Sequence, residues 1–248
     1  MKRKLLMLLL AVPLLAQEAL VNTTQAPPKI IQKLIPLKYA DPRTVENMLR
    51  VFDVQVVSNT ELHAMAVKGT PQTIQAVEEA IARLDTPAAA PKNIELTVYL
   101  LVGNEAADSP AGAIPKEMES VVTQLKNTFQ FKNYRLLDVM TLRTRTGQQA
   151  STESSGGFMQ YGNVTKPVTT TFTINSSSIG ADGSTIRIDQ IRTGTKIPQE
   201  QGPGQFNYQD LGLRTDLDIK EGQKVVVGRM GINRDQALFL VLTARVVQ

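Results

Sequence analysis

After Lys132 the sequence alternates apolar and polar residues with a two-residue period and shows no helical period. This alternation is typical of half-buried β-strands. Gly- and Asp-containing turns such as Asp182-Gly183 and Glu221-Gly222 separate the alternating segments, which is typical of antiparallel hairpins. Strands are predicted at Tyr134–Leu142, Thr169–Asn175, Thr185–Ile191, Leu211–Ile219, Lys224–Val227 and Ala237–Val246. The second half is therefore predicted to be mainly antiparallel β structure.

One strand and one helix precede these segments. Ile94, Leu96, Val98 and Leu100 alternate as in a strand. A helix of about residues 115–129 is predicted after Pro115, with an apolar face of Met118, Val121, Val122 and Leu125. The Ser- and Gly-rich segments Gln149–Gly157 and Pro198–Gly204 are predicted to be mobile loops. Residues 93–248 thus form a mainly β domain with one helix.

Residues 29–86 predict a smaller β-α-β-β-α unit. The first strand contains Pro36, which favours an edge strand because proline cannot donate to the ladder. Asp41-Pro42 begins a helix that reaches Phe52, and Thr70-Pro71 begins a second that ends at Asp85. The other two strands are predicted at Val54–Ser58 and Leu62–Lys68, and the apolar face of the second helix at Ile74, Val77, Ile81 and Leu84. The fold class is α+β: two helices on a three-stranded sheet, a linker at residues 87–92, and the β domain.

The N-terminus has the pattern of a secretory signal peptide at residues 1–16. Lys2, Arg3 and Lys4 precede the apolar run Leu5–Leu15, and Ala16 provides a small residue for cleavage. The run is too short to span a bilayer, for which about 20 residues are needed. Residues 17–28 are predicted to be a flexible leader. Cleavage removes three basic residues and lowers the formal net charge from +4 to near +1.

Composition excludes most familiar enzyme designs. The chain has no cysteine and one histidine, which excludes disulfide scaffolds, thiolate zinc sites and multi-histidine metal sites. The mature chain has no Lys/Arg cluster with interleaved aromatic residues, so we expect no nucleic-acid partner. It also has no second apolar run long enough for a membrane helix.

The residues that could support chemistry have simpler interpretations. His63 has no acid or nucleophile at a partnering distance in sequence, and Glu78-Glu79 sit on different faces of a helix. Asp216, Asp218 and Glu221 faintly resemble a calcium loop but lack its glycine and its remaining ligand positions. Arg143 and Arg145 lie on one side of a strand, where they either bind an anion or protect a charged edge. We expect no catalytic, cofactor or metal site.

A series of short motifs resembles the periplasmic ring-building modules of the bacterial secretin family. It consists of the Tyr39-Ala40 step before the first helix, Gly69 at the end of a strand, and Leu84-Asp85 closing the second helix. The match covers about Ile35 to Leu100. Further on, the segments around Gly147 and around Gly222 to Gly228 are similar to a strand turn and a late hairpin of that family, which implies a shortened secretin-like β region.

The resemblance implies a non-catalytic exported module that docks with copies of itself, as a ring or homo-oligomer, or with a secretin or another secretion-system component. Its expected role is in type II or III secretion or pilus-type assembly, in the periplasm or at the outer membrane. The alternative is a stand-alone periplasmic module that binds a peptide or cell-wall glycan along a sheet edge or groove. An enzyme is the least favoured hypothesis because no nucleophile–base constellation is present.

Overall fold

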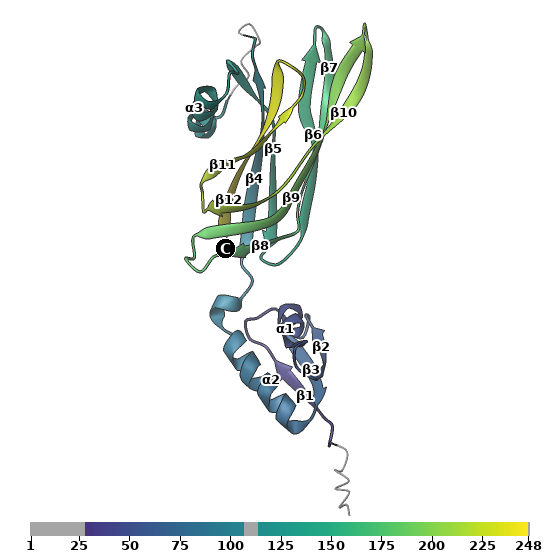
Figure 1. Ribbon diagram of the computed structural model, residues 1–248, viewed down its shortest axis with the longest axis vertical. Helices are drawn as coiled ribbons and strands as arrows, with labels where there is room; N and C mark the ends of the chain where they lie inside the picture. Colours follow the sequence, from purple (N-terminus) through teal and green to yellow (C-terminus); the bar gives the residue numbers. More distant parts are fainter. Residues whose placement is uncertain (1–27, 107–113, 248) are drawn as a thin grey trace, which may run out of the picture. The chain divides into compact units, whose positions relative to one another are not determined.

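The computed structural model describes residues 28–106 and 114–247, which divide into two compact units (Figure 1). The first unit contains residues 28–38 and Pro42–Asp85, and the second contains the chain from Thr86 onward together with Tyr39–Asp41. The predicted signal peptide and the predicted leader up to residue 27 lie outside the described residues. No helix within the described ranges is long and apolar enough to cross a membrane.

The first unit is a three-stranded antiparallel sheet covered on one face by two helices (Figure 1). The sheet order is β1-β3-β2, so β1, which ends in Pro36, is an edge strand as predicted. Its elements are β1 (Ile31–Pro36), α1 (Pro42–Leu49), β2 (Gln55–Asn59), β3 (Ala64–Gly69) and α2 (Pro71–Leu84). The predicted fold of two helices over three strands is confirmed.

Capping and apolar spacing explain where α2 forms. The Thr70 hydroxyl accepts a hydrogen bond from the Thr73 N–H at 3.2 Å, which satisfies one free N–H of the first turn, and Pro71 occupies the first helical position. Ile74, Val77 and Ile81 recur on one face and are all buried against the sheet. The other face of the sheet is open. There Leu34, Ala66 and Val57 form one cross-strand row, and Leu34 is 67% exposed.

Several boundaries in the first unit differ from the sequence-based expectation, most clearly the end of α1 and the start of β3. Helix α1 ends at Leu49 instead of Phe52, and the Phe52 N–H donates to the Leu49 carbonyl in a turn. Strand β3 begins at Ala64 instead of Leu62 because His63 has a left-handed φ of 45°. The Asn59 side chain holds this turn by accepting from the Leu62 N–H at 2.9 Å. Histidine tolerates this backbone region better than most residues do.

The second unit contains two antiparallel sheets and helix α3. One sheet has the order β11-β12-β4-β5, and the other has the order β10-β9-β7-β6 with β8 beside β9. Short 3₁₀ turns occur at Pro87–Ala89 and Lys116–Met118. The other elements are β4 (Asn93–Asn104), α3 (Glu119–Thr128), β5 (Asn133–Arg145), β6 (Ala150–Tyr161), β7 (Val164–Ile174), β8 (Ser176–Ile179), β9 (Thr185–Gly202), β10 (Gln205–Lys220), β11 (Lys224–Gly231) and β12 (Gln236–Val247).

Strands β4 and β12 lie at the centre of the four-stranded sheet. They are apolar on both faces because each face packs against a different layer of the unit. One face of each strand joins a core cluster shared with the five-stranded sheet, to which Leu96, Val98 and Leu240 belong. The opposite face, which includes Leu101 and Phe239, packs against α3. The predicted apolar face of the helix is confirmed, because Met118, Val121, Val122 and Leu125 are all buried in this second cluster.

The two predicted mobile loops are wrong. Gln149–Gly157 falls almost wholly within β6, whose Ser and Thr side chains form cross-strand contacts such as Ser151 with Thr173 at 2.9 Å. Backbone pairing with β7 therefore outweighs a composition that favours loops. Pro198–Gly204 extends β9 to Gly202 and then forms the turn into β10. Pro198 is tolerated because the pairing of β9 with β7 has already ended at Lys196.

Candidate functional site

The single histidine and the adjacent glutamates have separate roles on the surface of the first unit. His63 is exposed in its turn, where its carbonyl accepts from the Leu37 N–H at 2.7 Å. Glu78 pairs with Lys33 at 2.6 Å, and Glu79 accepts from the Gln75 side chain at 3.3 Å. These groups stabilise the exterior of the α2–β1 pair and do not converge on a common centre.

Arg143, predicted to be part of a basic patch, belongs to a charged row across the four-stranded sheet. Arg245, Glu95 and Arg143 are direct neighbours on β12, β4 and β5. The Arg143 Nε donates to Glu95 at 2.6 Å and the Arg245 Nε at 2.7 Å. These bonds, Arg143 first, hold the pKa of the Glu95 carboxyl below its usual range. Arg145 is exposed at the end of β5 and lines the same surface hollow as Arg143, so the predicted basic patch is present, with Arg143 already paired to Glu95.

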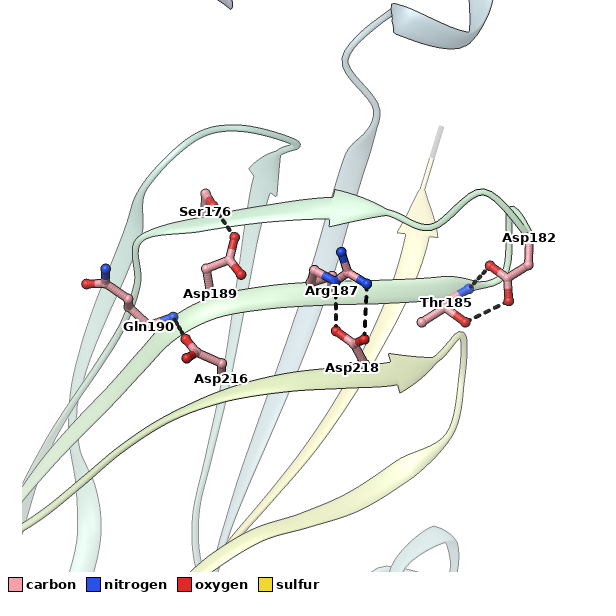
Figure 2. A network of polar contacts seen from close by, with 8 residues as sticks. All are labelled: Ser176, Asp182, Thr185, Arg187, Asp189, Gln190, Asp216 and Asp218. Atoms are coloured by element: carbon pink, nitrogen blue, oxygen red, sulfur yellow. Dashed lines mark hydrogen bonds and ion pairs between the residues drawn. The ribbon is translucent and has the colours of Figure 1, made fainter.

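The acidic residues Asp216, Asp218 and Glu221 also bind separate partners, and Figure 2 shows the first two. Asp216 accepts from the Gln190 N–H at 2.6 Å, and Asp218 pairs with Arg187 at 3.1 Å. Glu221 accepts from the backbone N–H of Val246 at 2.8 Å. In the described ranges no group of three or more acidic or histidine side chains could hold a metal ion.

Figure 2 also shows that Asp216 and Asp189 stabilise a bend in β9. Gln190 has a left-handed φ of 52° and sits where the register of β9 against β10 shifts. Before this point β9 pairs with β8, and after it β9 pairs with β7. Asp189 accepts from the Ser176 hydroxyl at 2.7 Å on the β8 side. The bend therefore transfers one strand between two partners, and the acidic side chains fix its geometry.

The N-terminal positions of the secretin resemblance have mainly structural surroundings. Ala40 is buried, and Tyr39 is exposed. A Cβ on Gly69 would lie 2.9 Å from the Val54 side chain, so only glycine fits this contact without a shift. Leu84 is the last residue of α2, and the Asp85 carboxylate accepts from the Lys38 N–H at 2.8 Å. Asp85 thereby connects the end of α2 to the segment that follows β1.

The three glycines from the later part of the resemblance lie at turns or close contacts. Gly147 and Gly222 have left-handed φ values of 77° and 75°, where glycine is favoured. The Gly147 N–H donates to Ser177, and the Gly222 N–H donates to Ala244, both at 2.8 Å. Gly228 lies opposite Leu213, and a Cβ there would come within 2.3 Å of the Leu213 side chain.

An exposed aromatic group at two hairpin ends was not predicted from the sequence. We call Tyr161, Lys166, Phe206 and Tyr208 the hairpin-end cluster; Phe158, on the same hairpin, lies on the opposite face of β6 from Tyr161. The Tyr161 and Phe206 rings are 5.2 Å apart, and the Lys166 ammonium lies 4.8 Å from the Phe206 ring. The Tyr161 hydroxyl also donates to the Pro198 carbonyl, so the cluster ties the β6–β7 hairpin to the β9–β10 hairpin.

Two aromatic rings on these hairpins are exposed. Phe158 is 52% exposed and Tyr208 is 46% exposed. Aromatic side chains are enriched in the centres of protein interfaces. The signal in the sequence is that each hairpin turn is bordered by two aromatic residues: Phe158 and Tyr161 precede Gly162, and Phe206 and Tyr208 follow Gly204.

The start of β10 adds a strand edge beside this cluster, whereas further along β10 Leu213 packs against Gly228 of β11. Strand β10 forms one end of the five-stranded sheet and is 16 residues long. An edge strand presents N–H and C=O groups that can pair with another chain. The hairpin-end cluster and the start of the β10 edge thus place aromatic side chains next to backbone groups that can pair with another strand.

Comparison with solved structures identifies the architecture. Neither the protein-family models nor the curated protein sequences contain a match to this chain. The type II secretin GspD of enteropathogenic Escherichia coli matches with a TM-score of 0.52 at 10% identity, over 88% of this chain and 87% of that one. The fold is secretin-like. The InvG secretin of the Salmonella SPI-1 injectisome matches with the same TM-score and identity, over 90% of this chain and 89% of that one.

A third secretin-like neighbour is the PulD complex of the Klebsiella pneumoniae type II secretion system, with a TM-score of 0.50 and 12% identity. The match covers 88% of this chain and 50% of the neighbour's chain. The secretin resemblance inferred from short motifs is thus supported at the level of fold, and it extends from the first unit into the second.

Proposed function

We propose that this chain is a non-catalytic, exported, secretin-like module that acts by docking to copies of itself or to another component of a bacterial secretion or pilus-type assembly. The observation that carries the proposal is the match to type II and type III secretins over about nine-tenths of the chain, which includes both units. The proposal is also supported by His63, Asp216 and Asp218, which are exposed and bind separate partners instead of meeting in one site.

The proposed docking surface is the hairpin-end cluster together with the β10 edge. Solved neighbours with this fold occur in complexes, as in the pilotin–secretin complex AspS–GspD and the complex of PulD with PulS and PulC. We propose that copies of this chain meet through β10, because an exposed strand edge flanked by aromatic rings combines backbone pairing with apolar contact.

Native mass spectrometry and negative-stain imaging of residues 17–248 test the proposal. We expect homo-oligomers that Tyr208→Lys disrupts, since a lysine on an edge opposes strand addition. Val51→Lys is the control, because it adds the same charge at an exposed valine that belongs to neither the hairpin-end cluster nor β10. A strictly monomeric chain that also fails to bind any secretion-system component would refute the proposed function.

Export is tested separately. We propose that residues 1–16 direct the chain out of the cytoplasm to the periplasm or the outer membrane. Cell fractionation and N-terminal mass analysis should recover a periplasmic or membrane-associated protein beginning near Gln17. A full-length chain that keeps Met1 and remains in the cytoplasm would contradict this part of the proposal.

A further inference from the structure

The second unit contains a cavity of about 300 Å³ where the end of the four-stranded sheet meets the end of the five-stranded sheet. The end of β4, the start of β5 and the start of β12 form one side, and the β6–β7 hairpin forms the other. Apolar atoms come from Val102, Phe158 and Met159, and polar groups include Gln160, Thr165 and Gln236. This volume is at the lower end of the range for small-ligand sites.

Arg135 is the charged residue that lines this cavity, and its guanidinium is incompletely satisfied. Its Nη2 contacts the Met159 sulfur at 2.8 Å, and a thioether is a weak acceptor. Across residues 28–106 and 114–247, no carboxylate forms an ion pair with Arg135. Burial also lowers the pKa of the guanidinium. Half-buried cations are usually paired, so most donors of this arginine remain for water or for a ligand.

The chemistry of the cavity selects a particular class of ligand. A guanidinium presents parallel N–H groups that match the two oxygens of a carboxylate. Arg135 carries one positive charge and no acidic residue lines the cavity, so the cavity can neutralise a ligand with one negative charge. The apolar wall of Val102, Phe158 and Met159 can cover a short hydrocarbon or aromatic group attached to that carboxylate.

We propose that the cavity beside Arg135 binds a carboxylate that carries a short apolar group. The ligand is either a small organic acid or the free C-terminus of a peptide, since both present this chemistry. The site is formed by one chain and goes beyond the proposed docking function, so it does not depend on oligomer formation.

The test is a titration of residues 17–248 labelled with ¹³C at the methionine methyl groups. N-acetyl-phenylalanine is the small-acid probe, and N-acetyl-Ala-Ala-Phe with a free C-terminus is the peptide probe. We expect a saturable shift of the Met159 methyl signal, assigned with Met159→Leu, and no shift of Met48 in the first unit. The affinity of the corresponding amides should be lower by about tenfold or more, because they lose the charge-assisted bonds.

Arg135→Met should reduce affinity for both acids by about tenfold or more, and Arg135→Lys should reduce it less because the charge remains. Arg145→Met is the matched control, since it removes an exposed arginine at the other end of the same strand. Tighter binding of the tripeptide points to a peptide terminus, and equal binding points to a small acid. An unmoved Met159 signal, or acids and amides that bind equally, would overturn the proposal. This acid–amide comparison needs no variant.

Discussion

Single polar residues hold backbone conformations that the local sequence does not favour. Gln190 has a positive φ, and the backbone N–H that this conformation exposes is satisfied by the Asp216 carboxylate at 2.6 Å. Asp182 acts similarly in the β8–β9 turn, where it accepts from the Thr185 N–H at 2.9 Å and from the Thr185 hydroxyl at 2.7 Å. The Gln190–Asp216 partnership was not predictable from the sequence, because it depends on the register of β9 against β10. The Asp182 bonds are local to the Asp182-Gly183 turn, which the sequence does predict.

Removing the Asp216 carboxylate should destabilise the second unit. We expect Asp216→Ala to lower the free energy of unfolding by about 1–3 kcal/mol, because the Gln190 N–H loses a charged acceptor at the bend. The measurement is urea denaturation. Asp218→Ala is the control, since it removes an exposed ion pair with Arg187 and should cost less than about 1 kcal/mol. Equal losses in the two variants would refute the role of Asp216.

The pKa of Asp182 predicts a pH dependence of stability. Hydrogen bonds from Thr185 and Ser184 hold this pKa well below its ordinary value of 3.8, so the ionised group stabilises the folded state. The contribution is fully present above the unfolded pKa and is lost as the pH falls toward the folded value. The stability difference between the wild type and Asp182→Asn should be constant above about pH 5 and shrink below about pH 4. If denaturation experiments gave the same stability difference at pH 3 as at neutral pH, the ionised Asp182 carboxylate would not be the source of the stabilisation.

At the scale of elements, helices were more predictable than polar strands. Helix α2 was predicted because Thr70, Pro71 and its apolar spacing are all local signals. Strand β6 was missed because its Ser, Thr and Gly residues favour loops, and only pairing with β7 makes it a strand. The hairpin-end cluster was missed for the same reason: its rings come from two hairpins whose proximity is a tertiary property.

The buried face of α2 can be tested directly. Ile81→Asp should unfold the first unit, because it buries an unpaired charge at a position that is 4% exposed, at a cost of several kcal/mol. Ala82→Asp is the matched control on the exposed side of the same helix. Circular dichroism and NMR of the first unit's methyl groups provide the measurement. A folded Ile81→Asp protein with an unchanged melting temperature would show that the assigned face is wrong.

At the scale of the whole molecule, the chain contains units with separate interiors. Both hydrophobic clusters of the second unit consist of residues from Ile94 onward. Sequence analysis predicted the division and the fold class because the helix–strand order changes after residue 86. It did not predict how the later strands are ordered in two sheets, since alternation marks a strand but not its neighbour.

The second unit should therefore fold by itself. We expect residues 86–248 to show a cooperative thermal transition within a few degrees of that of the second unit in the longer chain. Differential scanning calorimetry of both proteins provides the comparison. A broad, non-cooperative transition of the shorter protein would mean that its interior depends on residues before Thr86.

The position of β12 has a consequence for how the second unit folds. β12 lies between β11 and β4, so two neighbouring strands at the centre of this sheet are separated by about 140 residues of sequence. Without β12, β4 has an unpaired side and the interior of the second unit cannot close. Closing this sheet therefore requires contact between residues far apart in the sequence, which predicts slower folding of the second unit than of a domain built only from local hairpins.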